Sequence, residues 1–213
     1  MISTNGKDFA ETFKDSVISF SRKLLAKDAG ALTLRYVKPV TAERLKEIEN
    51  SNGIDLPIHL QRLLTEVASS FEFFWIFDDS DTKQEIASPV RSGFANWDID
   101  RLAKLIQIKR QTEEETVFEE AWTDKVPFMN FGNGNYLAVS REISHKVFYL
   151  TPAEPPDCIV PFDCNLFEFL LAWARIGCVN EQTLLRFRDH QSRLIDHEQA
   201  LVHEWISWLG KAD

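Results

Sequence analysis

The chain has few of the residues that build disulfide scaffolds or metal centres. Its 213 residues include three cysteines, Cys158, Cys164 and Cys178, and none of them belongs to a Cys-x-x-Cys pair. An odd number with this spacing argues against a disulfide framework and against a zinc site. Cys178 lies near an expected helix end, where it could act as a nucleophile. Because no local signature supports that role, we interpret it as a small buried apolar residue.

Long apolar runs are missing as well. The sequence begins Met-Ile-Ser-Thr-Asn-Gly-Lys-Asp, which contains no apolar signal region. No later run approaches the length that crosses a membrane. We therefore expect a cytoplasmic protein that has no membrane partner.

The familiar catalytic signatures are also absent. There is no Gly-x-Ser-x-Gly elbow, Walker loop or dinucleotide fingerprint. Gly132-Asn133-Gly134-Asn135 could be taken for a phosphate-binding loop, but such loops open a helix. Here the next residues, Tyr-Leu-Ala-Val, are typical of a strand. We interpret the segment as a tight hairpin turn in which Asn and Gly supply positive φ.

The histidines do not form a metal motif. His190, His197 and Glu204 are seven residues apart on one expected helix face, whereas helical ligands are usually three or four residues apart. Four residues separate Glu198 from His203, where the zinc-protease motif has two. We expect polar residues that flank an apolar stripe, and no metal, nucleotide or redox cofactor.

The chain is acidic, and its charge is uneven. The net charge is −9, and residues 51–213 carry fifteen basic and twenty-six acidic side chains, which gives −11 for that part. Such a surface repels nucleic acid and anionic membranes. If the charge selects a partner, the partner is a basic protein. The simpler alternative is that the acidity keeps the protein in solution.

What the sequence does contain is an antiparallel meander. Three apolar segments of strand length, 126–131, 135–140 and 146–150, are separated by turns too short for a crossover helix. The most apolar segment, 71–77, has apolar residues on both parities, which predicts a central strand with both faces buried. We expect these four segments to share one antiparallel sheet. A further short strand is expected within 31–37.

Apolar residues at helical spacing predict the helices that cover this sheet. The expected helices run over 8–27, from a cap at Thr41 to Gly53, from Pro57 through Val67, from a cap at Asn96 or Asp98 through 122 in two pieces, over 165–177, and along 181–210. Residues 78–95 are expected to form a polar loop with at most one irregular strand, and 151–161 a loop with four prolines. These elements predict an α+β fold in a single domain over 1–213.

Acidic residues gather in three places: the 78–95 loop, residues 113–124, and the proline-rich loop with the helix that follows it. For the second group, a solvated helix face with Lys109–Glu113 and Arg110–Glu114 ion pairs is the simplest interpretation. A paired-carboxylate hydrolase would need two acids that face one cleft, which linear spacing does not show. The candidate partner-binding residues are the loop-borne Asp78, Asp79, Asp81, Glu154 and Asp157.

Several short motifs follow one another in a recognisable order. They are Glu49-x-x-x-Gly53-Ile54-x-Leu56-Pro57, Val126-Pro127-Phe128, the turn Gly132-Asn133-Gly134, Tyr136-Leu137-Ala138-Val139, Val147-Phe148-Tyr149-Leu150 and Phe167-Glu168-Phe169-Leu170-x-x-Trp173. By this order and spacing, residues 41–177 resemble the SUKH superfamily, which includes fungal cell-wall-assembly regulators and bacterial immunity proteins. The expected helices in 1–30 and 180–213 lie outside the shared core.

The resemblance implies a sheet packed against helices and a non-enzymatic, protein-binding role. For bacterial members it implies immunity to a toxin that is encoded nearby, often a nuclease or deaminase. A nuclease carries a basic groove, which an acidic protein would attract. Two alternatives stay open, a regulatory adaptor of the fungal type and a hydrolase with an unrecognised site. The sequence does not indicate an oligomeric state.

Overall fold

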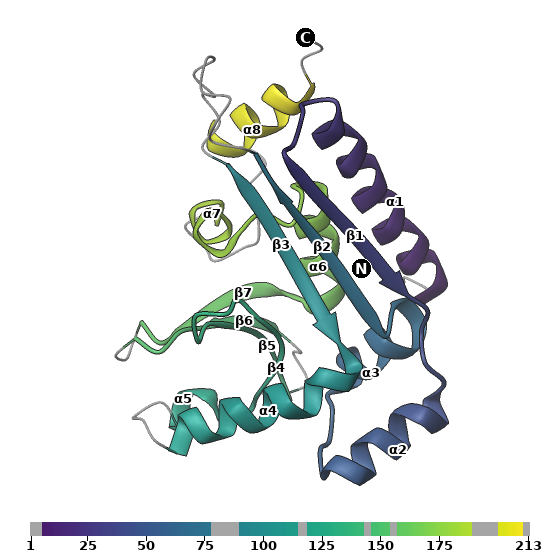
Figure 1. Cartoon of the computed structure of the whole chain (residues 1–213). Helices are drawn as coiled ribbons and strands as arrows, with labels where there is room; N and C mark the ends of the chain where they lie inside the picture. The colour runs from purple at the N-terminus through teal and green to yellow at the C-terminus, as the bar shows by residue number, and fades with distance from the viewer. Residues whose placement is uncertain are drawn as a thin grey trace.

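The computed structural model describes residues 6–77, 90–114, 119–142, 146–153, 157–188 and 200–210. Within these residues the chain forms an α+β fold in which two antiparallel sheets pack against helices (Figure 1). The strand order is β1-β2-β3 in the first sheet and β4-β5-β6-β7 in the second. None of the described helices is both long and apolar enough to cross a membrane.

The first sheet buries one face under α1 (Gly6–Leu25). Its strands are β1 (Ala31–Val37), β2 (Ser70–Ile76) and β3 (Ser92–Asp98). Phe13 of α1 meets Phe71 of β2 with ring centroids 5.2 Å apart, and both side chains are buried. The apolar stripe predicted for the first helix is therefore confirmed, because its spacing places large side chains on the side that faces the sheet.

Two further helices, α6 (Leu166–Arg175) and α8 (Ala200–Gly210), share the core with α1. Trp205 of α8 stacks on Trp75 at 5.6 Å, and its indole donates to the carbonyl of Ile176. Trp75 donates to the carbonyl of Gly177 at 2.6 Å. Gly177 has φ +83°, and a Cβ atom there would overlap the ring of Phe20. This crowded junction joins α1, α8 and the first sheet.

The second sheet is covered on both faces. It consists of β4 (Lys125–Asn130), β5 (Tyr136–Ser140), β6 (Lys146–Leu150) and β7 (Ile159–Asn165). Leu137 and Val139 of β5 belong to the main core, whereas Tyr136 and Ala138 belong to a smaller apolar cluster with Trp122. Helices α4 (Ile99–Glu114) and α5 (Glu119–Trp122) run along the side of this smaller cluster (Figure 1).

The helix caps agree with the predictions. Thr41 accepts the Arg44 N–H at the start of α2 (Ala42–Asn52), and Gly53 ends that helix in the left-handed conformation. Asp98 accepts the Asp100 N–H at the start of α4, 2.9 Å away. Asn165 caps α6 in a capping box, where the sequence predicted the helix over 165–177 but no particular cap. The predicted helix after Pro57 is α3 (Ile58–Arg62), which continues as a π-helical turn over Leu63–Val67.

The meander over 126–150 is confirmed, but the prediction that segment 71–77 joins it in one sheet is wrong. That segment is β2, which pairs with β1 on one side and with β3 on the other. Both of its edges are occupied, so no hydrogen-bonding edge remains for the meander. The prediction that both its faces are buried is also wrong, because the outward residues of β2 are only partly buried or exposed.

Two strands replace predicted loops. β3 is a regular strand, with Ala95 and Trp97 buried on its core side. β7 contains Pro161 and lies at the edge of the second sheet. A proline is tolerated there because the strand has a free side that needs no N–H donor. The four prolines of 151–161 favoured the prediction of a loop in place of the start of this strand.

The prediction of one helix over 181–210 is wrong. The structure has α7 (Glu181–Arg186), which ends at Phe187, and α8 starts at Ala200. The Phe187 ring is buried, and its N–H bonds to the carbonyls of Leu184 and Thr183 as the helix closes. Each piece packs against a different neighbour, which a single straight helix would not allow. Leu194, His190 and His197 lie outside the described residues.

Candidate functional site

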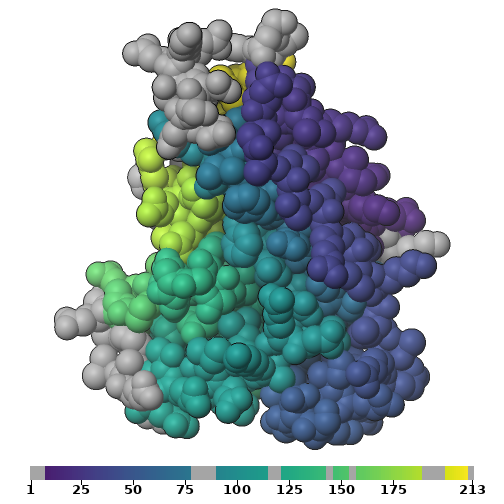
Figure 2. Space-filling view, viewed as in Figure 1, coloured from purple at the N-terminus to yellow at the C-terminus, as the bar shows by residue number. Residues whose placement is uncertain are grey.

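The outward side of the first sheet is not crossed by any described helix in Figure 1. On β1 and β2 the side chains on this side form part of the molecular surface (Figure 2). We call this surface the open sheet face. It consists of Ala31, Thr33, Arg35, Val37, Ser70, Glu72, Phe74, Ile76, Ser92, Phe94, Asn96 and Asp98, which alternate with buried residues along β2 and β3.

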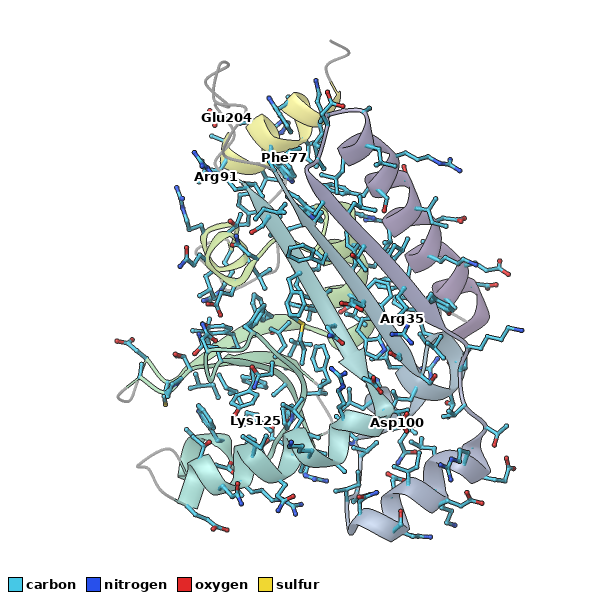
Figure 3. The ribbon with its side chains drawn as sticks, viewed as in Figure 1. Arg35, Phe77, Arg91, Asp100, Lys125 and Glu204 are labelled. Atoms are coloured by element: carbon cyan, nitrogen blue, oxygen red, sulfur yellow. The ribbon has the colours of Figure 1, made fainter. Side chains whose placement is uncertain are left out.

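The open sheet face combines apolar and charged rows. The strand register places Phe74 opposite Thr33 on one side and Phe94 on the other. Ile76 is 41% exposed. Arg35, labelled in Figure 3, lies opposite Glu72 across the β1–β2 pair. Opposite charges at such positions attract each other. The arrangement offers apolar contact area next to polar groups, which is typical of protein-binding surfaces.

At its β3 edge the open sheet face leads into an apolar groove of about 430 Å³. The groove lies between β3, α4 and β4, and its lining includes Asn96, Leu102, Leu105, Ile108 and Phe128. Ile108 is 38% exposed. Asn96 has no hydrogen-bond partner among the described residues. A partner could therefore place an apolar side chain in this groove and a polar group on the Asn96 amide.

A second hollow, which we call the charged cavity, lies on the other side of α4. Its volume is about 410 Å³, and α4, β4 and the end of β5 supply its lining. The lining side chains that carry charge are Lys109, Arg110, Glu113, Glu114, Lys125 and Arg141. Figure 3 places Lys125 between α4 and the second sheet. One face of α4 forms a wall of this cavity, because helical spacing places the side chains at positions 106, 109, 110 and 113 on the same side.

Lys109 and Glu113 form a buried ion pair in this cavity. Lys109 is 2% exposed and Glu113 is 7% exposed. The Lys109 ammonium donates to the Glu113 carboxylate and to the carbonyl of Trp122, which ties α4 to the end of α5. Burial lowers the pKa of Lys109, and the bond to Glu113 offsets part of that shift. The prediction that this pair is solvated is therefore wrong.

The remaining charges of the cavity are held less tightly. Lys125 pairs with Asp124, which also accepts a bond from Ser140. Although burial raises the pKa of Asp124, the bonds from Lys125 and Ser140 outweigh it, so the pKa lies below its usual value. Arg141 donates through Nη1 to the carbonyl and carboxylate of Asp55.

The predicted Arg110–Glu114 ion pair does not form, because neither residue has a partner within the described part of the chain. Glu113 and Glu114 both line the cavity, which is the arrangement that a paired-carboxylate hydrolase would need. Glu113 is already bonded to Lys109, however, and adjacent residues of a helix point in different directions. The cavity therefore offers no pair of opposed carboxylates.

The predicted partner-binding residues lie mostly outside the described residues. This holds for Asp78, Asp79, Asp81 and Glu154. Asp157 is exposed in the turn before β7. The described residue that precedes the first group, Phe77, packs against Trp208 of α8 with ring centroids 5.3 Å apart (Figure 3). Phe77 follows a strand of the first sheet, whereas Asp157 precedes a strand of the second.

The other candidate chemistry has structural roles. The Gly132–Asn135 segment is the predicted turn, and Asn133 and Asn135 both donate to the carboxylate of Glu181 on α7. Burial raises the pKa of the Cys178 thiol, which keeps it protonated and a poor nucleophile. Among the described residues, no group of three or more His, Cys, Asp or Glu side chains could hold a metal ion.

Sequence reasoning missed the open sheet face and the charged cavity. A signal for the first was present, since Phe74 and Ile76 gave β2 its unusual apolar character on both parities. This pattern led to the wrong prediction that both faces of the strand are buried. For the second, nothing in the polar run from Lys109 to Thr116 distinguishes a buried lysine from a solvated one.

Comparisons with protein families and with curated proteins find no match to this chain. The resemblance to the SUKH superfamily therefore stays a prediction based on the order of segments.

Proposed function

We propose that this chain is a non-enzymatic protein-binding domain and that its partner docks on the open sheet face. The observation that carries the proposal is the outward side of β2, a central strand on which Phe74 is partly buried and Ile76 is 41% exposed. Solvent-exposed apolar residues on a flat, ordered surface are costly unless a partner covers them. The adjoining apolar groove extends the contact area and offers an anchor position.

The partner that fits the chain best is a basic protein. The net charge of −9 attracts a basic domain over a long range, and the field acts before contact is made. With the SUKH resemblance, this makes a cytoplasmic immunity protein that neutralises a cognate toxin, possibly a nuclease, the leading proposal. The loop acids Asp78, Asp79, Asp81 and Glu154, with the exposed Asp157, would steer the toxin toward the complex.

Co-expression with a toxin candidate encoded by an adjacent gene tests the proposal. Survival of the cells and recovery of a complex by pull-down are the expected results. A complex that forms without protecting the cells would favour the alternative, a regulatory adaptor of the cell-wall-regulator type. The absence of both rescue and a complex, with this toxin and with other basic partners of the same locus, would contradict a protein-binding role.

The steering part of the proposal has its own test. Changing Asp78, Asp79 and Asp81 together to Ala should slow association and leave dissociation nearly unchanged, with an effect that shrinks as salt is added. A matched control changes three acids of another surface, Asp8, Glu11 and Asp15 on α1, which leaves the net charge equal to that of the triple variant. Equal slowing by both variants would show that only the total charge matters.

A further inference from the structure

The charged cavity has the size and the lining of a small-molecule site. Its volume of about 410 Å³ lies within the range of pockets that hold small ligands. The lining contains four cationic side chains, Lys109, Arg110, Lys125 and Arg141, and two carboxylates, Glu113 and Glu114. Three of these cations have a carboxylate partner, Lys109 in Glu113, Lys125 in Asp124 and Arg141 in Asp55. Arg110 has no acidic partner among the described residues, and its positive charge matches an anionic ligand.

The buried ion pair forms a fixed wall of the cavity. Lys109 is held by Glu113 and by the Trp122 carbonyl, so its ammonium does not need a ligand for its charge to be compensated. The same pairing neutralises Glu113, which would otherwise repel an anion. The pair therefore shapes the cavity and is not expected to bind the ligand directly.

The donors that remain are the two arginines. Arg110 is exposed and has no hydrogen-bond or ion-pair partner within the described ranges. The bonds of Arg141 to Asp55 involve only Nη1, out of a guanidinium that carries five N–H donors. Asp55 is 89% exposed in its side chain, so its hold on Arg141 is screened by water. The guanidinium plane matches the two oxygens of a carboxylate or phosphate.

From these features we propose that the charged cavity binds a small organic anion, a carboxylate or a phosphate ester, through Arg110 and Arg141 beside Lys125. The ammonium of Lys125 lies over the ring of Phe148, 4.6 Å from its centroid, and its charge beside the arginines is compensated by Asp124. Glu114 is the one lining carboxylate without a partner among the described residues, and it opposes the ligand. This site is on α4 and does not depend on the proposed partner-binding function.

Titration of the purified full chain with citrate and, separately, with inorganic phosphate tests the proposal. Ionic strength is held constant with chloride, and binding is followed by calorimetry and by backbone amide shifts. The expected result is saturable binding of at least one probe, with shifts in 106–114 and 123–127. Citrate binding alone would identify a carboxylate ligand, and phosphate binding alone a phosphate ester. If neither probe binds saturably, the proposal is overturned.

Substitutions locate the site. Arg110→Gln should weaken binding about tenfold or more, as expected for the loss of a charge-assisted bidentate contact. Arg101→Gln is the matched control, because Arg101 is exposed on the same helix but lines the apolar groove instead. Glu114→Gln should strengthen binding. Equal weakening by Arg110→Gln and Arg101→Gln, or weakening by Glu114→Gln, would show that the anion does not bind in the cavity.

Discussion

Individual residues decide how neighbouring helices are held together, and Lys109 is the clearest case. Its ammonium satisfies a carboxylate on its own helix and a backbone carbonyl at the end of α5. Removing one member of a buried pair leaves the other charge without compensation, whereas replacing both with apolar residues removes the problem. The pair is therefore a test of how much the α4–α5 connection depends on charge.

Lys109→Ala is expected to destabilise the protein by about 3–5 kcal/mol, because the Glu113 carboxylate and the Trp122 carbonyl lose the ammonium that they accept from. The double change Lys109→Met with Glu113→Leu should recover most of that loss. Lys104→Ala, on the exposed side of the same helix, is the control and should be nearly neutral. Urea unfolding measures all three. A Lys109→Ala variant as stable as the wild type would show that the pair contributes nothing.

The ionisation of Tyr149 makes the free energy of unfolding depend on pH in the alkaline range. Burial, together with the neighbouring Glu181 carboxylate, raises the pKa of Tyr149 from 10.0 to about 12. The folded protein keeps the phenolic proton where the unfolded chain releases it. This contribution is fully present below pH 10.0 and is lost as the pH rises toward about 12. One proton changes stability by at most about 1.4 kcal/mol per pH unit.

The Tyr149→Phe variant should therefore lose less stability than the wild type between pH 10.0 and about 12. Denaturant unfolding at a series of pH values across this window provides the comparison. Glu181→Gln should change the slope in the same direction, because it removes the carboxylate that disfavours ionisation. Identical slopes in all three proteins would mean that Tyr149 titrates normally when folded.

Gly177 combines two constraints that a pair of substitutions can separate. Its φ is +83°, and a Cβ atom would overlap the ring of Phe20. Gly132 has a similar φ of +88° and nothing within 4 Å of such an atom. Gly132→Ala should cost only the backbone strain, about 1–2 kcal/mol. Gly177→Ala should add an overpacking cost of about 1–3 kcal/mol. Equal melting temperatures for the two variants would contradict the crowded junction.

At the scale of elements, α8 depends on one aromatic anchor. Trp205 is fully buried, stacks between Trp75 and Trp208, and donates to the Ile176 carbonyl. Truncating a buried Trp to Ala costs about 3–5 kcal/mol, so Trp205→Ala should lower the midpoint of unfolding sharply. His203→Ala, on the exposed side of α8, serves as the control. Little change in the Trp205 variant would mean that α8 is not part of the core.

The elements that the sequence predicted well are those whose local signals agree with their packing. The α1 stripe, the Thr41 cap and the meander turns were all readable, because spacing and cap chemistry act within a few residues. The separate sheets were not readable. Which strand pairs with β2 depends on contacts between distant parts of the chain, since even the closest β1–β2 pair, Val37 with Ser70, is 33 positions apart.

The candidate site shows the same limit. The apolar outward residues of β2 were visible, but whether a neighbour covers them is a property of the whole fold. Lys109 belongs to a polar run, and its burial results from the way α4 crosses β4. Periodicity therefore showed the apolar residues of β2 but did not predict that one side of the strand stays exposed.

As a whole, the molecule combines an acidic chain with a partly apolar sheet face that no described helix covers. Charge would set how fast a basic partner arrives, and the open sheet face would set how long it stays. These two contributions are separable, because added salt slows association, whereas replacing an apolar residue of the open sheet face speeds dissociation. The charged cavity on the other side of α4 is independent of both.

The most direct test is the dissociation constant of the complex with the cognate toxin for three proteins: wild type, Ile76→Lys and Leu25→Lys. Ile76 and Leu25 are both exposed apolar residues, 41% and 59% exposed, but only Ile76 lies on the open sheet face. Ile76→Lys should weaken binding about tenfold or more, mainly through faster dissociation, while Leu25→Lys should bind like the wild type. Unchanged binding of the Ile76→Lys protein would contradict docking on the open sheet face.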